Sequence, residues 1–168
     1  LTKPIGSGVL MAGEMAGKAA GDTVLAAWET MSQPQDEAAR LLAGCARAMT
    51  DVTGFGLMGH LNEICEGSEL KAKVWFDQIP HLPGVFDYIE QGCVPGGTGR
   101  NFDSYGHRLG NMSEQQKALL CDPQTSGGLL LAVSPEAEAE VQAVAERHGI
   151  ELNAIGELLP ADGDTTLI

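Results

Sequence analysis

Apolar and polar positions recur with two different periods along this chain, and the two periods predict both helices and strands. Leu57, Leu61 and Ile64 have helical spacing, so residues 56–66 predict an amphipathic helix. Similar patterns predict helices over about 22–31, 33–45, 82–89, 113–120 and 134–148. Alternation over 70–76 and 152–158 predicts strands, and the apolar run 129–133 predicts a central strand.

Residues that begin or end helices support several of these boundaries. Ser32 with Gln35, and Ser113 with Gln116, have the spacing of a capping box at a helix start. Gly92 and Gly149 are placed to end helices, because glycine adopts left-handed angles without steric cost. Residues 45–49 fit either the end of a helix or a short strand.

Two segments show neither the helical nor the strand period. Residues 1–21 are rich in glycine and small residues, which favours an extended segment, and Lys3 within them is expected to be a solvated surface charge. Residues 92–112 contain six glycines and predict a long loop without regular structure. Such a loop is either functional, as a flap or a contact to another domain, or a mobile surface loop, and its role is left open.

The alternation of strands with one-faced helices predicts an α+β fold. We expect a layered α/β sandwich in which helices pack on a mixed sheet, with split β-α-β character. The length of 168 residues fits a single domain spanning 1–168.

Charge and cysteine content exclude several classes of function. The formal net charge of -13 opposes binding to nucleic acid or to an anionic membrane surface. The four cysteines, Cys45, Cys65, Cys93 and Cys121, form no CxxC pair, so we expect reduced thiols in a cytoplasmic protein. No run of 18 apolar residues and no signal peptide is visible. His81 and His148 are expected to be ordinary loop and helix-end residues.

The candidate chemistry lies in the segment Thr50-Asp51-Val52-Thr53-Gly54-Phe55-Gly56, called the elbow here, which leads into the helix at 56–66. Its two glycines allow the backbone to approach a ligand, and the N–H groups of the helix start favour an anion such as phosphate. A carboxylate repels phosphate unless a cation lies between them, and Mg²⁺ commonly binds both. Asp51 is therefore a candidate metal ligand. The alternative is that Asp51 or Thr53 only caps the helix.

Four motifs together resemble those of the selenophosphate synthetase (selenide, water dikinase) family. They are the elbow with Leu57, the opening Leu1-Thr2-Lys3-Pro4-Ile5-Gly6-Ser7-Gly8, the run Pro95-Gly96-Gly97-Thr98 with Asn101, and Asp122-Pro123-Gln124-Thr125-Ser126-Gly127-Gly128. They occur in the family's order, and they resemble its C-terminal domain only. That family belongs to a superfamily that includes aminoimidazole ribonucleotide synthetase, whose C-terminal domain is an α/β sandwich partly like the ferredoxin fold.

The resemblance implies an enzyme that makes selenophosphate, AMP and phosphate from ATP, selenide and water. It implies Mg²⁺ bound by Asp51 and a nucleotide-binding elbow shaped by Thr53, Gly54 and Gly56. It also implies an N-terminal domain that precedes the chain and carries the catalytic Cys or selenocysteine and other metal ligands. The full-length enzyme is expected to be a homodimer. None of the four cysteines here takes the catalytic role, so this chain alone is expected to be inactive.

Two alternatives remain open at this point. The chain is either the half of that enzyme, or a non-catalytic nucleotide- or protein-binding module of the same fold. Within the superfamily, a relative with another acceptor is a further possibility, because the selenide end lies in the N-terminal half.

Overall fold

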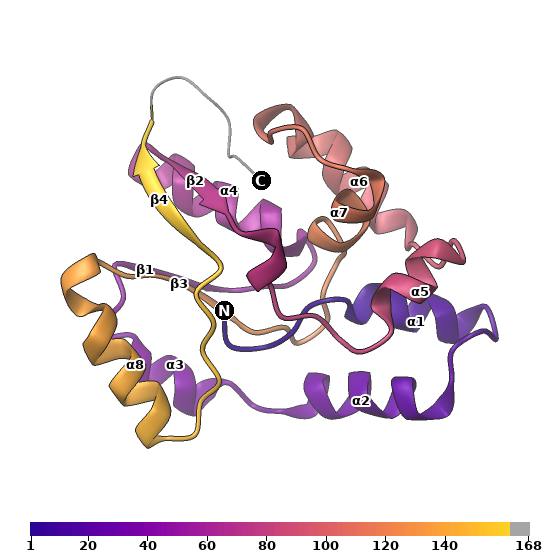
Figure 1. The fold of residues 1–168 in the computed structure, drawn as a ribbon, viewed down its shortest axis with the longest axis horizontal. Helices are drawn as coiled ribbons and strands as arrows, with labels where there is room; N and C mark the ends of the chain where they lie inside the picture. Colours follow the sequence, from indigo (N-terminus) through magenta and orange to yellow (C-terminus); the bar gives the residue numbers. More distant parts are fainter. Residues whose placement is uncertain (162–168) are drawn as a thin grey trace.

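The structure, a computed structural model, describes residues 1–161 and is built from helices and short strands (Figure 1). Its helices and strands are α1 (Ser7–Met15), α2 (Gly21–Ser32), α3 (Asp36–Leu42), β1 (Ala48–Asp51), α4 (Gly56–Ser68), β2 (Leu70–Val74), α5 (Val85–Glu90), α6 (Gly96–Tyr105), α7 (Glu114–Leu120), β3 (Leu129–Ala132), α8 (Glu138–Arg147) and β4 (Gly156–Pro160). Three short 3-10 turns are η1 (Phe76–Gln78), η2 (Gly106–Arg108) and η3 (Pro135–Ala137). Within the described range, no helix has the length and apolarity needed to cross a membrane.

The α+β class is confirmed, but the strands form two antiparallel pairs where a single mixed sheet was expected. β1 pairs with β3, with Ala48 opposite Ala132, and β2 pairs with β4, with Leu70 opposite Pro160. In the described part of the chain β3 therefore has one neighbouring strand and is not central. A single parallel bridge joins Ile5 to His81 outside these strands.

The core consists of two clusters of buried apolar side chains. The larger cluster joins α1, α4, α5, α7 and the β2–β4 pair, and its fully buried members include Val9, Leu57, Met58 and Leu120. The smaller cluster lies where α3 and α8 pack on one another, around Leu42 and Val141 (Figure 1). The β1–β3 pair contributes to both clusters, so it connects them.

Most predicted helices are confirmed. The helix predicted at 56–66 is α4, the one at 22–31 is α2, and the one at 82–89 is the shorter α5. The capping box of α7 is present: Ser113 accepts from the Gln116 N–H, and Gln116 Oε1 accepts from the Ser113 N–H. Gly92 and Gly149 have φ of 77° and 64°, as their places after helix ends require. Residues 48–51 form a strand, which decides between the two readings of that segment.

The prediction of an extended segment over 1–21 was wrong, because residues Ser7–Met15 form α1. The side chains that satisfy the first N–H groups of α1 come from residues more than a hundred positions later in the chain. Helix propensity, which depends on neighbouring residues only, cannot predict a helix that is stabilised by such distant side chains.

The prediction of a structureless loop over 92–112 was also wrong, because Gly96–Tyr105 form α6 and 106–108 form a 3-10 turn. Three glycines lie in the first turn of α6 and weaken its helical signal. The helix buries Thr98, Asn101 and Tyr105 on one face, and this tertiary packing outweighs the low propensity.

Two smaller predictions need correction. Ser32 does not cap the next helix: it is the last residue of α2, and α3 begins at Asp36. Lys3 is not a surface charge, since its side chain is buried and its Nζ donates to the carbonyls of Gln33 (2.7 Å) and Ser126 (2.8 Å). Burial lowers the pKa of Lys3.

Candidate functional site

The elbow connects the end of β1 to the start of α4, and residues from the 122–128 loop hold it from behind. The Val52 N–H donates to the Gly128 carbonyl at 2.8 Å. The Thr53 carbonyl accepts from the N–H groups of both Gly56 and Gln124, each at 3.0 Å. The main chain of the elbow is therefore fixed on its inner side by hydrogen bonds.

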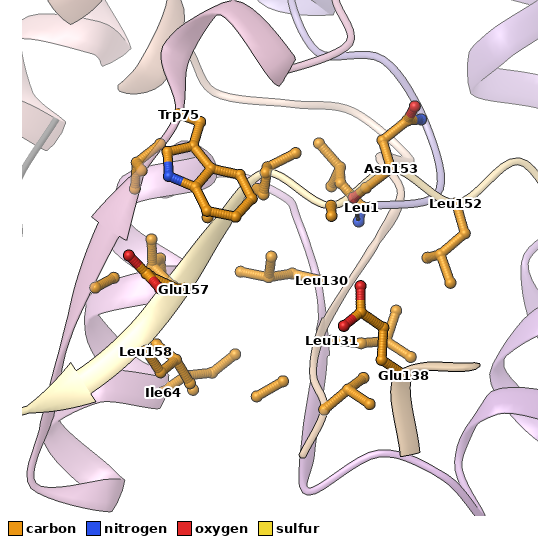
Figure 2. A pocket seen from close by; sticks show the side chains of 18 of the residues that line it. Leu1, Ile64, Trp75, Leu130, Leu131, Glu138, Leu152, Asn153, Glu157 and Leu158 are labelled. Carbon is orange, nitrogen blue, oxygen red and sulfur yellow. Dashed lines mark hydrogen bonds between the residues drawn. The ribbon is translucent and has the colours of Figure 1, made fainter. Parts of the chain in front are cut away.

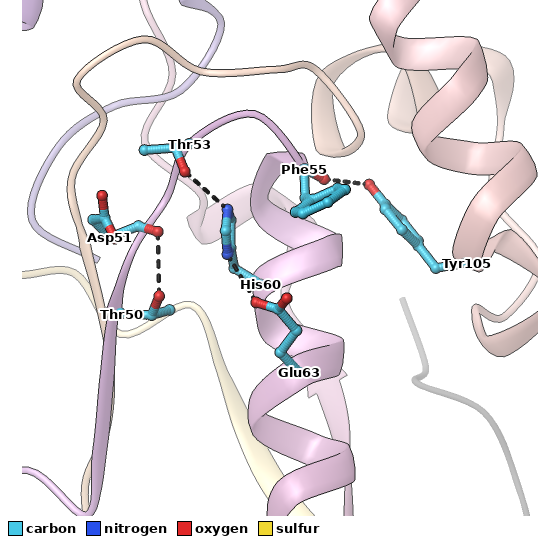
Figure 3. Close-up of polar contacts among 7 residues, drawn as sticks. All are labelled: Thr50, Asp51, Thr53, Phe55, His60, Glu63 and Tyr105. Atoms are coloured by element: carbon cyan, nitrogen blue, oxygen red, sulfur yellow. Dashed lines mark hydrogen bonds and ion pairs between the residues drawn. The ribbon is translucent and has the colours of Figure 1, made fainter.

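The helix α6 holds the next two carbonyls of the elbow. Asn101 Nδ2 donates to the Gly54 carbonyl at 2.9 Å and also to that of Cys121 at 3.0 Å. The Tyr105 hydroxyl donates to the Phe55 carbonyl at 2.6 Å (Figure 3). Asn101 and Tyr105 lie four residues apart and so share one face of α6. The segment predicted to be a loop is therefore a support for the elbow.

The same 122–128 loop caps α1 from the opposite side. Asp122 Oδ2 accepts from the N–H groups of Gly8 (3.0 Å) and Val9 (3.3 Å), and Gln124 Oε1 accepts from those of Gly6 and Ser7. The Asp122 side chain is fully buried, and this burial raises the pKa of its carboxyl group to about 7, although its hydrogen bonds act in the other direction. Two of the motifs singled out in the sequence thus form one structural unit.

The two glycines of the elbow have different roles. Gly56 has a φ of 71°, and a Cβ there would lie 2.9 Å from the Cys121 carbonyl carbon. Gly56 is therefore required by the turn and by close packing. Gly54 is exposed, a Cβ there would meet nothing within 4 Å, and within residues 1–161 its N–H donates no hydrogen bond. Gly54 is the open position of the elbow.

Asp51 and Thr53 lie on the outer face of the elbow. Val52 between them is fully buried, whereas Asp51 is exposed and Thr53 half-buried, as the alternation of an extended chain requires. Within the described residues the Asp51 carboxylate makes no hydrogen bond or ion pair. The reading of Asp51 or Thr53 as a helix cap was wrong, because Phe55 is the N-cap of α4 and no side chain bonds there.

A buried histidine next to Thr53 was missed in the sequence. His60, on the second turn of α4, places Nε2 at 3.3 Å from Thr53 Oγ1 and Nδ1 at 3.0 Å from Glu63 Oε2 (Figure 3). Glu63 lies three residues after His60 on a helix, a spacing that brings the two side chains together. That spacing is the signal that could have revealed the pair.

A hard cation could be bound by Asp51, but within residues 1–161 the side chains do not form a full set of ligands around it. Among the described residues no group of three or more His, Cys, Asp or Glu side chains converges. Three of the four cysteines, Cys65, Cys93 and Cys121, are buried, and burial raises the pKa of the Cys121 thiol.

A cavity of about 440 Å³ lies apart from the elbow, between the β2–β4 pair and the β3–α8 region (Figure 2). Its lining is largely apolar and includes Leu130, Leu158 and Trp75. Neither Asp51 nor any elbow residue lines it. Its charged lining side chains are Lys73, Glu138 and Glu157, so two carboxylates stand against one cation and disfavour a phosphate. The elbow remains the candidate site.

Comparison with known proteins supports the sequence resemblance. The chain is 63% identical over 172 residues to selenide, water dikinase of Photobacterium profundum, covering 99% of this chain and 49% of that protein. The chain thus spans about half the length of the curated relatives it matches. The resemblance to selenide, water dikinases is confirmed at this level.

Solved structures share the fold at low sequence identity. Thiamine-monophosphate kinase from Stenotrophomonas maltophilia K279a matches with a TM-score of 0.66 at 15% identity, covering 98% of this chain and 48% of that chain. AaThiL complexed with AMPPCP and TMP matches with a TM-score of 0.57 at 15% identity, covering 98% of this chain and 45% of that chain. The model of the AIR synthase related protein, C-terminal domain, matches residues 1–167, and the chain therefore belongs to this family.

Proposed function

We propose that the chain is the metal- and nucleotide-binding C-terminal half of a selenide, water dikinase. The full-length enzyme, meaning this chain together with the half that its relatives have in addition, makes selenophosphate, AMP and phosphate from ATP, selenide and water. The proposal rests on the 63% identity to a selenide, water dikinase and on the elbow, where the Asp51 carboxylate has no partner among residues 1–161 and Gly54 is open to a ligand.

In this proposal Asp51 contributes one carboxylate ligand to Mg²⁺, and the N–H groups of Gly54 and Phe55 face the phosphates. Mg²⁺, when bound, neutralises phosphate charge during phosphoryl transfer, a reaction that depends on positioning and electrostatic stabilisation. Thr53 lies on the same face as Asp51, and Gly56 shapes the turn. The hydrogen bonds from Asn101 and Tyr105 keep this arrangement fixed before a ligand binds.

The remaining ligands and the reactive Cys or selenocysteine belong, in this proposal, to an N-terminal domain. AMPPCP in the structurally similar AaThiL is consistent with ATP as the nucleotide. A homodimeric, cytoplasmic full-length enzyme completes the proposal. The lack of a complete ligand set among residues 1–161 leads us to expect neither ATP hydrolysis nor selenophosphate formation from this chain alone.

The substitution Asp51→Asn in the full-length enzyme tests the proposal. Asp51 is exposed and does not cap α4, so the free energy of unfolding should change by less than about 0.5 kcal/mol. Selenide-dependent AMP formation should fall by roughly 10² to 10³, the scale of a lost electrostatic contact in a transition state. Near-normal turnover at saturating Mg²⁺ would remove Asp51 from the metal site, whereas an unaltered full-length protein without selenide-dependent AMP formation would favour a non-catalytic binding module.

A further inference from the structure

His60 is a buried polar side chain that the proposed function does not use. Its exposed fraction is 7%, and its ring lies edge-on to that of Phe55, with centroids 6.0 Å apart. Both ring nitrogens have partners, Thr53 Oγ1 on one side and Glu63 Oε2 on the other (Figure 3). A buried ring with two polar partners has a fixed orientation, so the direction of each hydrogen bond can be worked out.

The partner on Nδ1 decides where the proton lies. An ionised carboxylate only accepts hydrogen bonds, so Nδ1 of His60 must carry the proton that is donated to Glu63. In a neutral imidazole the other nitrogen is then an acceptor, and Nε2 has no proton. For the neutral ring, the contact of 3.3 Å between Nε2 and Thr53 Oγ1 therefore makes the threonine hydroxyl the donor.

This direction determines what Thr53 presents to the outside. With its proton turned toward His60, Oγ1 keeps its lone pairs for a partner on the outer face of the elbow. Asp51 lies two residues earlier on the same face, on the far side of the buried Val52. The Thr53 carbonyl is already used by Gly56 and Gln124, so the hydroxyl is its remaining oxygen. An oxygen that only accepts is the donor type that Mg²⁺ and its bound waters prefer.

We propose that Thr53 Oγ1 is a second oxygen for the Mg²⁺ of the elbow, bound directly or through a metal-bound water, and that His60 and Glu63 are positioning residues which hold its proton away from the cation. The inference rests on the proposed function, because it takes the cation at Asp51 as given. It adds two residues that do not touch the cation and act only through Thr53.

The first test is spectroscopic and does not depend on activity. The full-length enzyme is labelled with ¹⁵N-histidine, and the His60 signals are identified by their loss in His60→Phe. The expected spectrum shows a proton on Nδ1 and none on Nε2. In Glu63→Gln, whose side chain can donate as well as accept, the preference for this tautomer should weaken. A proton on Nε2 in the unaltered enzyme would overturn the inference, because Thr53 would then be the acceptor.

The second test is a double-mutant cycle on the Mg²⁺ concentration that gives half-maximal activity. Thr53→Val and His60→Phe should each raise this concentration by about tenfold, the lower end of what the loss of a residue behind a metal ligand costs. The double variant should be no worse than Thr53→Val alone, since His60 acts through Thr53. Thr53→Ser, which keeps the hydroxyl, should restore a near-normal value.

His81→Phe is the matched control, because His81 is exposed and packs edge-on against Phe86, with ring centroids 4.7 Å apart, away from the elbow. Effects of His60→Phe that simply add to those of Thr53→Val would overturn the inference and leave His60 a packing residue. Glu63→Gln guards against a His60→Phe variant that fails to fold, because the Glu63 side chain is 60% exposed. Glu63→Gln should raise the Mg²⁺ concentration needed for half-maximal activity when Thr53 is present, but not when it is combined with Thr53→Val. An equal effect in both proteins would also overturn the inference.

The two proposals fail in different ways. Full activity of Asp51→Asn would remove the cation from the elbow whatever His60 does. An inactive Asp51→Asn enzyme combined with additive effects at Thr53 and His60 would leave the cation in place and remove only the positioning role.

Discussion

The hydroxyl of Tyr105 donates a 2.6 Å hydrogen bond to the main-chain carbonyl of Phe55, the N-cap residue of α4. Burial raises the pKa of Tyr105 well above its usual range, so the phenol keeps its proton for this bond. This hydrogen bond links α6 to the N-terminal end of α4.

Tyr105→Phe should therefore loosen the elbow. We expect a loss of about 1–3 kcal/mol in the free energy of unfolding, because a partly buried carbonyl loses its donor. Urea denaturation measures this, and amide exchange at Val52 and Gly56, whose N–H groups donate hydrogen bonds within the elbow region, should become faster. Tyr88→Phe makes the same chemical change away from the elbow, where the Tyr88 hydroxyl accepts from the Ala20 N–H at 3.0 Å. Faster exchange at the elbow in that control as well would show that the effect of Tyr105 is global.

Asp122→Asn should change how stability depends on pH. Because the folded pKa of about 7 lies above the ordinary value of 3.8, the folded chain holds a proton that the unfolded chain releases in this interval. The contribution of Asp122 to stability therefore decreases as pH rises from about 4 to about 7, and the penalty is complete above that range. Asparagine carries no charge, so the variant should gain stability relative to the parent as pH rises through this window.

Chemical denaturation at pH 5 and pH 8 measures the difference between the two proteins. Asp103→Asn, at an exposed position of α6, removes the same formal charge and separates the effect of net charge from that of Asp122. A parent-to-variant difference that is the same at both pH values would contradict the prediction.

Alanine at the two elbow glycines should give opposite results. Gly56→Ala places a side chain on a backbone with a φ of 71° and 2.9 Å from the Cys121 carbonyl carbon, so we expect a loss of roughly 2–4 kcal/mol. Gly54→Ala meets open space and should change thermal stability by less than about 1 kcal/mol. In the full-length enzyme the added methyl at Gly54 should instead raise KM for ATP. Equal destabilisation by both substitutions would contradict the distinct roles.

Lys3→Met should be costly, although the new side chain is apolar. Two carbonyls, those of Gln33 and Ser126, lose their donor in a partly buried place, and we expect a loss of about 1–3 kcal/mol in the free energy of unfolding. Lys18→Met is the matched control, because Lys18 Nζ also donates to a carbonyl, that of Gln91, but in an exposed place. Its loss should be below about 0.5 kcal/mol as measured by urea denaturation.

The parts of the fold that were predictable from sequence depend on local pattern. The apolar stripe of Leu57, Leu61 and Ile64 defines α4 by itself, and Ser113 with Gln116 caps α7 within four residues. The missed elements, α1 and α6, are glycine-rich helices supported by distant side chains. Asp122 and Gln124 cap α1 from the far end of the sequence. Asn101 and Tyr105 of α6 form their hydrogen bonds only because the elbow packs against that helix in the folded chain. No local propensity contains that information.

In the candidate site, too, residues of a local motif were predictable, whereas contacts between distant segments were not. Asp51, Thr53 and Gly54 were predicted because they lie within one short, recognisable motif. His60 was overlooked because it lies inside an apolar stripe, where a buried residue reads as core, and its partner Thr53 lies seven positions earlier. Gly56 was expected to serve a ligand, but its close contact with Cys121 becomes visible only when two distant segments meet.

The capping of α1 by Asp122 and Gln124 has a consequence for how the domain is made. On the ribosome, the N–H groups of Gly6 and Gly8 emerge 118 and 114 residues before the side chains that accept their hydrogen bonds. Throughout that interval of translation α1 lacks its cap, and its apolar residues Val9 and Leu10 lack part of the core that buries them. Completion of the domain is therefore a late event in synthesis, and nascent chains that stop before Gln124 should be open to proteases at their first helix.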